Sequence, residues 1–329
     1  MGVDTVNVIT ENPLLVDNSM ELISVVTPAY NEMKNLPLLY ERLQIVLDAL
    51  PYHWEWVIID DHSADDTFAV INRLAALDCR VRGIRLARNS GSHIALTCGL
   101  HAARGKCAIA LASDLQDPPE TIPLLLHEWH SGNQVVWAAR SQRLGESAQR
   151  QRTSNFYYWL MRHVVGLKQM PPMGADFFLL DQGVLLAFRQ FREGNVSILA
   201  LITWMGFRQT FITYTKQARN HGKSGWTLKK KLKLFIDSIT GFSYFPIRFM
   251  SYLGTSVALL GFLYAIFLIF NGLFGNPPQG WTTILVVILV IGGLQMLMMG
   301  VLGEYLWRAL DESRRRPLYL IEAITGKQQ

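Results

Sequence analysis

Short apolar runs alternate with segments of helical spacing over residues 20–140 of the chain. The first helical segment shows the pattern clearly, since Leu36, Leu39, Leu43 and Leu47 recur every three or four positions. The β-rich runs cover residues 22–27, 56–59, 81–86, 107–112 and 135–139, and the helical segments cover residues 36–50, 63–77, 93–104 and 119–129. This alternation predicts an α/β domain with a mostly parallel sheet and helices on both faces. Ligands of such sheets bind beyond the carboxyl ends of the strands.

The pattern changes near the C-terminus, because no Asp, Glu, Lys or Arg occurs between Arg248 and Glu304. A helix that spans a bilayer needs about 20 apolar residues, so this stretch has room for two spans, near 250–272 and 281–303. The basic residues that flank it are Lys229, Lys230, Lys231 and Lys233 on one side and Arg314, Arg315 and Arg316 on the other. By the positive-inside tendency, both flanks are expected in the cytoplasm.

The formal net charge of +5 would suit either nucleic acid or an anionic membrane. The basic residues beside the apolar region favour the membrane, so no nucleic-acid partner is expected. Residues 216–248 mix lysines with large apolar side chains, which is typical of helices that lie in the membrane interface. An ordinary amphipathic surface helix is the alternative.

The expected organisation has five parts. They are an N-terminal extension (1–20), an α/β catalytic domain (21–215), interfacial amphipathic helices (216–248), two transmembrane helices (249–305) and a cytoplasmic tail (306–329). Glycines in the second span, Gly292, Gly293 and Gly300, could allow close packing against a partner helix, so a homo-oligomer is an open expectation.

Polar residues follow the first two predicted strands. After the first strand, the Tyr30 ring could stack on a base and the Glu32 carboxylate could bind its polar edge; a simple strand-to-helix turn is the alternative. After the second strand, Asp60 and Asp61 could accept hydrogen bonds from a ribose or a base. Their alternative is a helix cap with an acidic first turn, with Ser63 as the N-cap of the next helix.

The segment from Ser113 to Glu120 follows the fourth predicted strand. Side chains two positions apart on an extended segment point to the same side, so Asp114 and Gln116 could share one cation. Their oxygen atoms suit Mg²⁺ or Mn²⁺ bridging a diphosphate. Asp117, before two prolines, could instead be only a turn former, and a capped turn is the alternative for the whole segment.

Phosphate contacts must come from side chains and a metal, because the sequence contains no glycine-rich phosphate loop of the ATPase or dehydrogenase type. Arg140 and Arg150, with Ser154 nearby, could bind phosphate through the planar guanidinium group. A solvated basic loop is the alternative. Asp176 lies among apolar residues, where a carboxylate is costly to bury without a role, so it could be a base or the partner of an arginine.

Together, and in this order, these segments resemble the GT-A-fold family 2 glycosyltransferases. The resemblance is greatest to the dolichyl-phosphate mannose synthase-like branch and to the bacterial polyprenyl-phosphate (bactoprenol) glucosyltransferases. It is carried by Pro28-Ala29-Tyr30-Asn31-Glu32, Ile59-Asp60-Asp61-His62-Ser63, Arg88-Asn89-Ser90-Gly91, Asp114-Leu115-Gln116-Asp117-Pro118-Pro119-Glu120 and Gly174-Ala175-Asp176-Phe177. It extends from about residue 21 to the C-terminus and includes the two spans.

The resemblance implies a role for each site residue. The residues that would bind the nucleotide are Pro28, Tyr30, Glu32, Asp60, Asp61, Arg88 and Ser113. Asp114 and Gln116 would bind Mg²⁺ or Mn²⁺ on the donor diphosphate, and Arg140, Arg150 and Ser154 would hold the phosphates, including that of the acceptor. Asp176 would lie near the acceptor as the candidate base, so Asp114 and Asp176 are the expected catalytic residues.

Two departures from the family pattern stand out. Ala112 replaces the first acid of the Asp-Ala-Asp-Leu-Gln pattern, and His62 replaces the glycine that usually follows the acid pair. The Gln-x-x-Arg-Trp signature of processive polysaccharide synthases is missing, which favours transfer of one sugar.

The resemblance therefore implies an inner-membrane, multi-pass enzyme with a cytoplasmic catalytic domain. It would transfer one sugar, with inversion, from a nucleotide donor to polyprenyl phosphate. UDP-glucose is the expected donor, and GDP-mannose is the second candidate. A processive glycan synthase and a non-catalytic nucleotide-binding membrane scaffold are the two rival interpretations.

Overall fold

The computed structural model describes residues 20–140, 159, 161–163, 177–191, 193, 197–215, 217, 240, 243, 245–273, 280–314 and 316–325. The strands are β1 (Leu22–Ala29), β2 (His53–Asp60), β3 (Val81–Leu86), β4 (Cys107–Ala110), β5 (Val135–Arg140), β6 (Phe177–Asp181), β7 (Gln209–Tyr214) and β8 (Ile321–Ile324). The helices of the α/β domain are α1 (Asn35–Asp48), α2 (Thr67–Leu77), α3 (Ser92–Ala102), α4 (Ile122–His130), α6 (Gln182–Phe188) and α7 (Ile198–Trp204), and a 3₁₀ turn at Pro119–Thr121 precedes α4.

The strands of the described residues form one sheet in the order β7-β5-β6-β4-β1-β2-β3-β8. The central strands β4, β1, β2 and β3 are parallel to one another, and β5 pairs with β7 in parallel. Only β6 and β8, among the described strands, run antiparallel to their neighbours. The carboxyl ends of the central strands therefore meet at one edge of the sheet, where Ala29 of β1 lies opposite Asp60 of β2.

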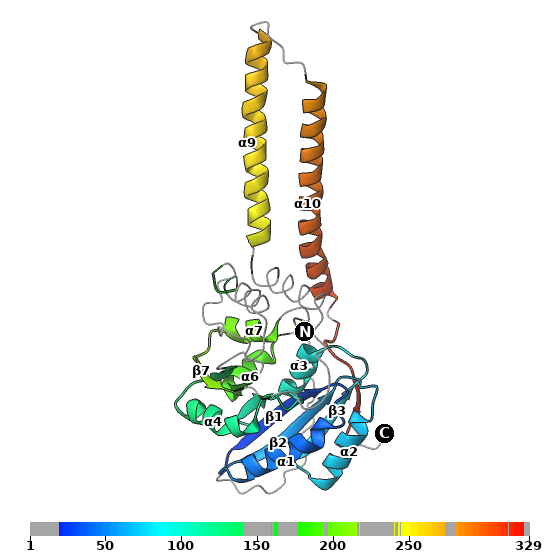
Figure 1. The fold of residues 1–329 in the computed structure, drawn as a ribbon, viewed down its shortest axis with the longest axis vertical. Helices are drawn as coiled ribbons and strands as arrows, with labels where there is room; N and C mark the ends of the chain where they lie inside the picture. Colours follow the sequence, from blue (N-terminus) through cyan, green and yellow to red (C-terminus); the bar gives the residue numbers. More distant parts are fainter. Residues whose placement is uncertain are drawn as a thin grey trace, which may run out of the picture.

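The sheet is covered on both faces, and each face has its own apolar core. Helices α1, α2 and α4 bury leucine and isoleucine side chains, such as Leu39, Ile71 and Leu125, against one face. Helices α3, α6 and α7 bury Leu100, Phe188 and Ile202, among others, against the other face. Figure 1 shows α3 and α7 on the side of the sheet that is nearer to the long C-terminal helices. This arrangement confirms the expected α/β architecture with a mostly parallel sheet.

The two C-terminal helices extend away from the sheet side by side (Figure 1). They are α9 (Phe245–Leu273) and α10 (Trp281–Ser313), with 29 and 33 residues. At about 1.5 Å per residue, each is longer than the ~30 Å hydrocarbon core of a bilayer. Their most apolar windows, Phe245–Phe267 and Val290–Ser313, have mean hydropathies of 1.6 and 1.3, and no part of either is buried within the protein. Both helices are thus long and apolar enough to cross a membrane.

The structure departs from the sequence-based expectations at three places. Helix α2 begins at Thr67, with Asp66 at the N-cap position, so the expectation that Ser63 caps this helix is wrong. Helix α10 continues past residue 305, to Ser313. Part of the expected tail then returns to the domain as β8, which pairs with β3 at the edge of the sheet.

Residues 1–19 and most of 216–248 lie outside the described residues. The expected N-terminal extension and interfacial helices therefore remain predictions.

Candidate active site

Three loops at the carboxyl ends of central strands each contain a non-glycine residue with a positive φ angle. They are Asn31 after β1, His62 after β2 and Leu115 after β4, with φ values of 58°, 58° and 59°. The left-handed region is unfavourable for side chains other than glycine, and such strain persists only where surrounding contacts impose it. The backbone is therefore held in an unusual path at the edge where ligands of this fold class bind.

The loop after β1 presents an exposed ring beside a fixed carboxylate. Tyr30 is 48% exposed, so its ring is open to a stacking partner. The Glu32 backbone N–H donates to Thr67 Oγ1 at 2.9 Å, and the Glu32 carboxylate accepts from Asn35 Nδ2 at 2.5 Å. Pro28 lies in β1 just before this loop, where its carbonyl oxygen accepts a 3.1 Å hydrogen bond from Ser113 Oγ.

The Asp60 carboxylate at the end of β2 is fully buried. One oxygen accepts the Ser63 backbone N–H at 3.0 Å, and the other lies 3.4 Å from a guanidinium nitrogen of Arg85. That second oxygen makes no hydrogen bond within the part of the chain that the structure describes. Ser63 in turn accepts the Asn31 backbone N–H through its hydroxyl at 2.9 Å, which joins the loops after β1 and β2.

The Asp61 carboxylate is turned into the protein and holds the loop before α3. Its two oxygens accept the backbone N–H groups of Ser90 and Gly91, at 2.7 and 2.8 Å. Burial raises the pKa of Asp61, and the two backbone hydrogen bonds partly oppose that rise. Asp61 thus fixes the Arg88–Gly91 loop, and the Arg88 side chain on this loop is exposed.

The segment after β4 is a turn and not an extended run. Leu115 is buried and left-handed, and the Asp114 carboxylate accepts the Gln116 backbone N–H at 3.2 Å. The strand alternation that would place Asp114 and Gln116 on one side therefore does not apply. Asp114 is nevertheless held in place, 9% exposed, beside a half-buried Gln116.

Asp117 has a structural contact in the same segment. It is 1% exposed and accepts a hydrogen bond from the Tyr214 hydroxyl of β7. The Tyr214 ring packs edge-on against Phe177, with ring centroids 5.8 Å apart. Asp117 thus connects the turn after β4 to β7, the strand at one edge of the sheet.

Some expected site residues lie outside the described residues. These are Arg150, Ser154 and Asp176. Arg140 is the last residue of β5 and lies opposite Tyr214 in the strand register, but its side chain is outside the described part of the structure. The roles expected for these residues remain predictions.

Sequence reasoning missed Arg85, which lies beside Asp60, and Glu322, which binds Arg85. Arg85 lies in β3 and Glu322 in β8, and the Arg85 Nε donates to the Glu322 carboxylate at 3.0 Å. The available signal for Arg85 was the presence of arginines, Arg82 and Arg85, within the predicted strand 81–86. No local pattern could have placed Glu322 there, because the contact joins positions 237 residues apart.

The described residues contain no group of three or more His, Cys, Asp or Glu side chains arranged to hold a metal ion. Mg²⁺ is commonly bound by one or two carboxylates together with substrate phosphates. The Asp114 carboxylate, with Gln116 two positions later in the same turn, fits that donor set.

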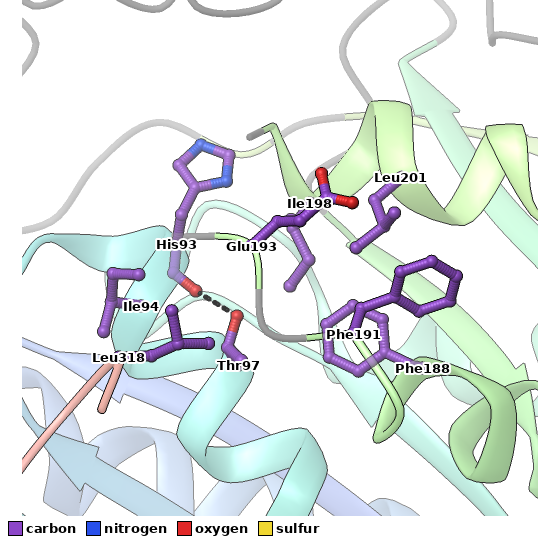
Figure 2. Close-up of a pocket in the computed structure, with 9 residues that line it drawn as sticks. All are labelled: His93, Ile94, Thr97, Phe188, Phe191, Glu193, Ile198, Leu201 and Leu318. Atoms are coloured by element: carbon purple, nitrogen blue, oxygen red, sulfur yellow. Dashed lines mark hydrogen bonds between the residues drawn. The ribbon is translucent and has the colours of Figure 1, made fainter. Parts of the chain in front are cut away.

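A small pocket lies elsewhere, on the face covered by α3, α6 and α7. Figure 2 shows His93 and Thr97 of α3 on one side of it and Phe188, Ile198 and Leu201 on the other. Leu318, from the segment between α10 and β8, closes part of its wall. None of the residues expected to bind nucleotide or metal lines this pocket, so we do not assign it to the donor.

Comparison with known proteins identifies the family. Residues 24–192 match the model of glycosyl transferase family 2. The chain is 34% identical to the uncharacterized glycosyltransferase YkcC of Bacillus subtilis (strain 168), over 92% of this chain and 94% of that protein. It is 36% identical to the bactoprenol glucosyl transferase of Shigella phage SfV, over 91% of this chain and 98% of that protein.

Among solved structures, the chain is similar to the glucosyl-3-phosphoglycerate synthase of Mycobacterium tuberculosis, crystallised with Mn²⁺, UDP and glucosyl-3-phosphoglycerate. The identity is 16% and the TM-score is 0.47, over 67% of this chain and 78% of that chain. The family match and the two relatives in sequence are sufficient: this chain belongs to glycosyl transferase family 2 and is a glycosyltransferase.

Proposed function

We propose that this glycosyltransferase moves one glucose from UDP-glucose to polyprenyl phosphate at the cytoplasmic face of the membrane. The observation that carries the proposal is the 36% identity to the phage bactoprenol glucosyl transferase, which extends over 91% of this chain. A match of that extent takes in the α/β domain and also reaches the apolar helices α9 and α10. The acceptor is therefore a lipid phosphate that the membrane itself delivers.

The donor nucleoside binds at the loops after β1 and β2. The exposed Tyr30 ring stacks on the base, and the Glu32 carboxylate, oriented by Asn35 and Thr67, accepts hydrogen bonds from it. Asp60 holds the loop after β2 by accepting the Ser63 backbone N–H, and Asp61 fixes the loop that carries Arg88. Ser113 joins the loop after β4 to Pro28, so the nucleoside and diphosphate ends of the site keep a fixed separation.

The diphosphate lies beside the turn after β4. Asp114 and Gln116 would hold Mg²⁺ or Mn²⁺ there, and such a cation neutralises the charge of the leaving nucleoside diphosphate. Asp114 is suited to this task because its backbone turn is already formed and its largely buried side chain is held in place. Arg140, Arg150 and Ser154 hold the remaining phosphate oxygens, including those of the acceptor.

The reaction is a single displacement with inversion. An anionic oxygen of the lipid phosphate attacks the anomeric carbon of glucose from the face opposite UDP and forms a new C–O bond. The bond from that carbon to the β-phosphate oxygen breaks, and its electron pair leaves with UDP. The acceptor oxygen carries no proton at neutral pH, since the second phosphate pKa is near 6. Asp176 therefore orients the acceptor and is not required to remove a proton from it.

The membrane fixes where this chemistry occurs. Lys229–Lys233 precede α9 and Arg314–Arg316 follow α10, so both ends of the helix pair lie on the cytoplasmic side with the α/β domain. The acceptor phosphate then emerges from the bilayer on the same side as the nucleotide donor.

A donor screen tests the proposal. The full chain, purified in detergent, is incubated with undecaprenyl phosphate, Mg²⁺ or Mn²⁺ and radiolabelled UDP-glucose, GDP-mannose or other UDP-sugars, and the lipid product is extracted. We expect label in the lipid from UDP-glucose only, one hexose per lipid by mass spectrometry, and an inverted anomeric centre by NMR.

Any different outcome points to a different function. Label from GDP-mannose would make the protein a mannosyltransferase, and a ladder of product lengths would make it a processive synthase. Nucleotide binding without any sugar transfer would indicate that the protein is a non-catalytic, nucleotide-binding membrane scaffold.

A further inference from the structure

The residues on either side of the C-terminal strand β8 (Ile321–Ile324) attach it to the α/β domain by several specific contacts. Thr325 donates its backbone N–H to the Gly83 carbonyl oxygen at 3.0 Å, and Thr325 Oγ1 accepts the Gly83 N–H at 2.9 Å. The Leu320 carbonyl oxygen accepts the Ala87 N–H at 2.8 Å, and the Tyr319 hydroxyl lies 3.1 Å from His101 Nδ1. The segment that leaves α10 is therefore part of the α/β domain (Figure 1).

Glu322 is the residue of β8 that reaches toward the donor loops. Its carboxylate accepts from Arg85 Nε at 3.0 Å and lies 3.2 Å from His62 Nδ1. The same His62 nitrogen lies 3.1 Å from the Leu86 carbonyl oxygen. Because both of these neighbours are acceptors, the proton of the imidazole must be on Nδ1. Glu322 thus binds one side chain from β3 and one from the loop after β2.

Arg85 connects Glu322 to the buried end of β2. Its guanidinium lies 3.4 Å from Asp60 Oδ2 and donates to the Ser63 carbonyl oxygen at 3.3 Å. It also lies 5.5 Å from the centre of the Phe68 ring, which limits its freedom further. Since Ser63 Oγ accepts the Asn31 N–H, an unbroken set of contacts runs from Glu322 to the loop that carries Tyr30 and Glu32.

We propose that Glu322 is a positioning residue for the donor nucleotide, through Arg85 and His62, and that the donor loops take their final geometry only when β8 is docked. The inference rests on the proposed function, because it needs the loops after β1 and β2 to bind the nucleoside. Isolated ion pairs of partly exposed side chains contribute little. The pair of Glu322 with Arg85 differs, because it holds Arg85 against the fully buried carboxylate of Asp60. If the pair is lost, Arg85 is held less firmly and the buried charge of Asp60 is poorly compensated.

The consequence is a coupling between the membrane anchor and the donor site. Helix α10 ends at Ser313 and β8 begins at Ile321, so a short connection links the second apolar helix to the strand that carries Glu322. The chain connects the α/β domain to the apolar helices twice, before α9 and after α10, and the second of these connections leads directly into β8.

Steady-state kinetics of the full chain in detergent test the proposal, with UDP-glucose and undecaprenyl phosphate varied separately. Glu322→Gln keeps the shape of the side chain and removes its charge. We expect it to raise the KM for UDP-glucose about fivefold, the upper range for a partly exposed ion pair, with kcat and the acceptor KM unchanged within about twofold. Arg85→Gln raises the donor KM further, and adding Glu322→Gln to it raises the KM by less than it does in the wild type, because only the contact of Glu322 with His62 remains to be lost.

Thr325→Val is the matched control. It removes the side-chain contact between Thr325, which directly follows β8, and Gly83 of β3, without touching Arg85, His62 or Asp60. We expect it to leave the donor KM unchanged.

Three results decide the matter. An unchanged donor KM in Glu322→Gln, or an equal rise in Thr325→Val, overturns the positioning role while leaving the proposed function intact. A wild-type protein that transfers no sugar from any nucleotide donor overturns the proposed function and this inference together.

Discussion

The carboxylate of Asp61 accepts the backbone N–H of Gly91 at 2.8 Å, where Gly91 adopts a φ angle of 92°. The neighbouring Ser90 N–H binds the other carboxylate oxygen at 2.7 Å. A carboxylate with two oxygens can accept both donors at once, which a shorter or neutral side chain cannot do equally well. Asp61 therefore determines the path of the loop between β3 and α3, and the second acid of the Asp60-Asp61 pair acts on the protein itself.

Asp61→Asn should destabilise the protein by about 1–3 kcal/mol, because the amide has one acceptor oxygen and turns its NH₂ group toward a backbone N–H that is left unsatisfied. Thermal unfolding of the detergent-purified chain measures the effect. Asp66→Asn is the control, since Asp66 is exposed and its side chain does not cap α2. Equal melting temperatures for wild type and Asp61→Asn would show that the loop does not depend on the carboxylate.

Asp114→Asn should reduce sugar transfer by about 100-fold or more, the usual cost of removing one electrostatic contact to a transition state. The asparagine oxygen can still accept the Gln116 N–H, so the turn and the melting temperature should be preserved. Initial rates over a range of Mg²⁺ or Mn²⁺ concentrations measure the loss.

Glu120→Gln is the control for that experiment. Glu120 belongs to the same segment but is about half exposed in an ion pair with Arg42. Full activity of Asp114→Asn at every metal concentration would remove Asp114 as the metal ligand.

The alternation of strands and helices could be predicted because the central parallel strands are compact and rich in apolar residues, even where β3 contains Arg82 and Arg85. The runs at 22–27 and 56–59 were predicted a few residues short and occur as Leu22–Ala29 and His53–Asp60. The antiparallel strands β6 and β8 were not predicted. β8 has only four residues, and its stabilisation comes from pairing with β3, which no local pattern can indicate.

The sequence predicted which residue types form the site and which strand ends they follow, but it did not predict how their side chains are oriented. Asp60, Asp61 and Asp114 do follow central strands at one edge of the sheet. Which oxygen atoms remain for a ligand depends on backbone donors about 30 residues away, such as Ser90 for Asp61. Leu115 gave no sign of its left-handed conformation, because leucine is among the residues that avoid it.

His62 occupies a backbone position that suits glycine, since its φ angle is 58°. His62→Ala and His62→Gly both remove the contacts to Leu86 and Glu322, but only glycine relieves the left-handed strain. His62→Gly should therefore be more stable than His62→Ala by about 1 kcal/mol. Parallel thermal or denaturant unfolding of the two variants measures the difference. An alanine variant as stable as the glycine variant would mean that the loop relaxes away from this conformation.

The stability of the domain should fall as the pH drops below about 6.5, in part because of His101. Burial lowers the pKa of His101, and the nearby positive charge of Arg189 lowers it further. The unfolded chain then takes up a proton at a higher pH than the folded protein does, so stability rises with pH between the folded and the unfolded pKa. His101→Gln should reduce the loss of melting temperature between about pH 7.5 and 5.5, whereas exposed His127→Gln should keep the wild-type loss. Identical pH profiles for wild type and His101→Gln would show that protonation of this histidine, beside Tyr319 of the C-terminal segment, does not contribute to acid sensitivity.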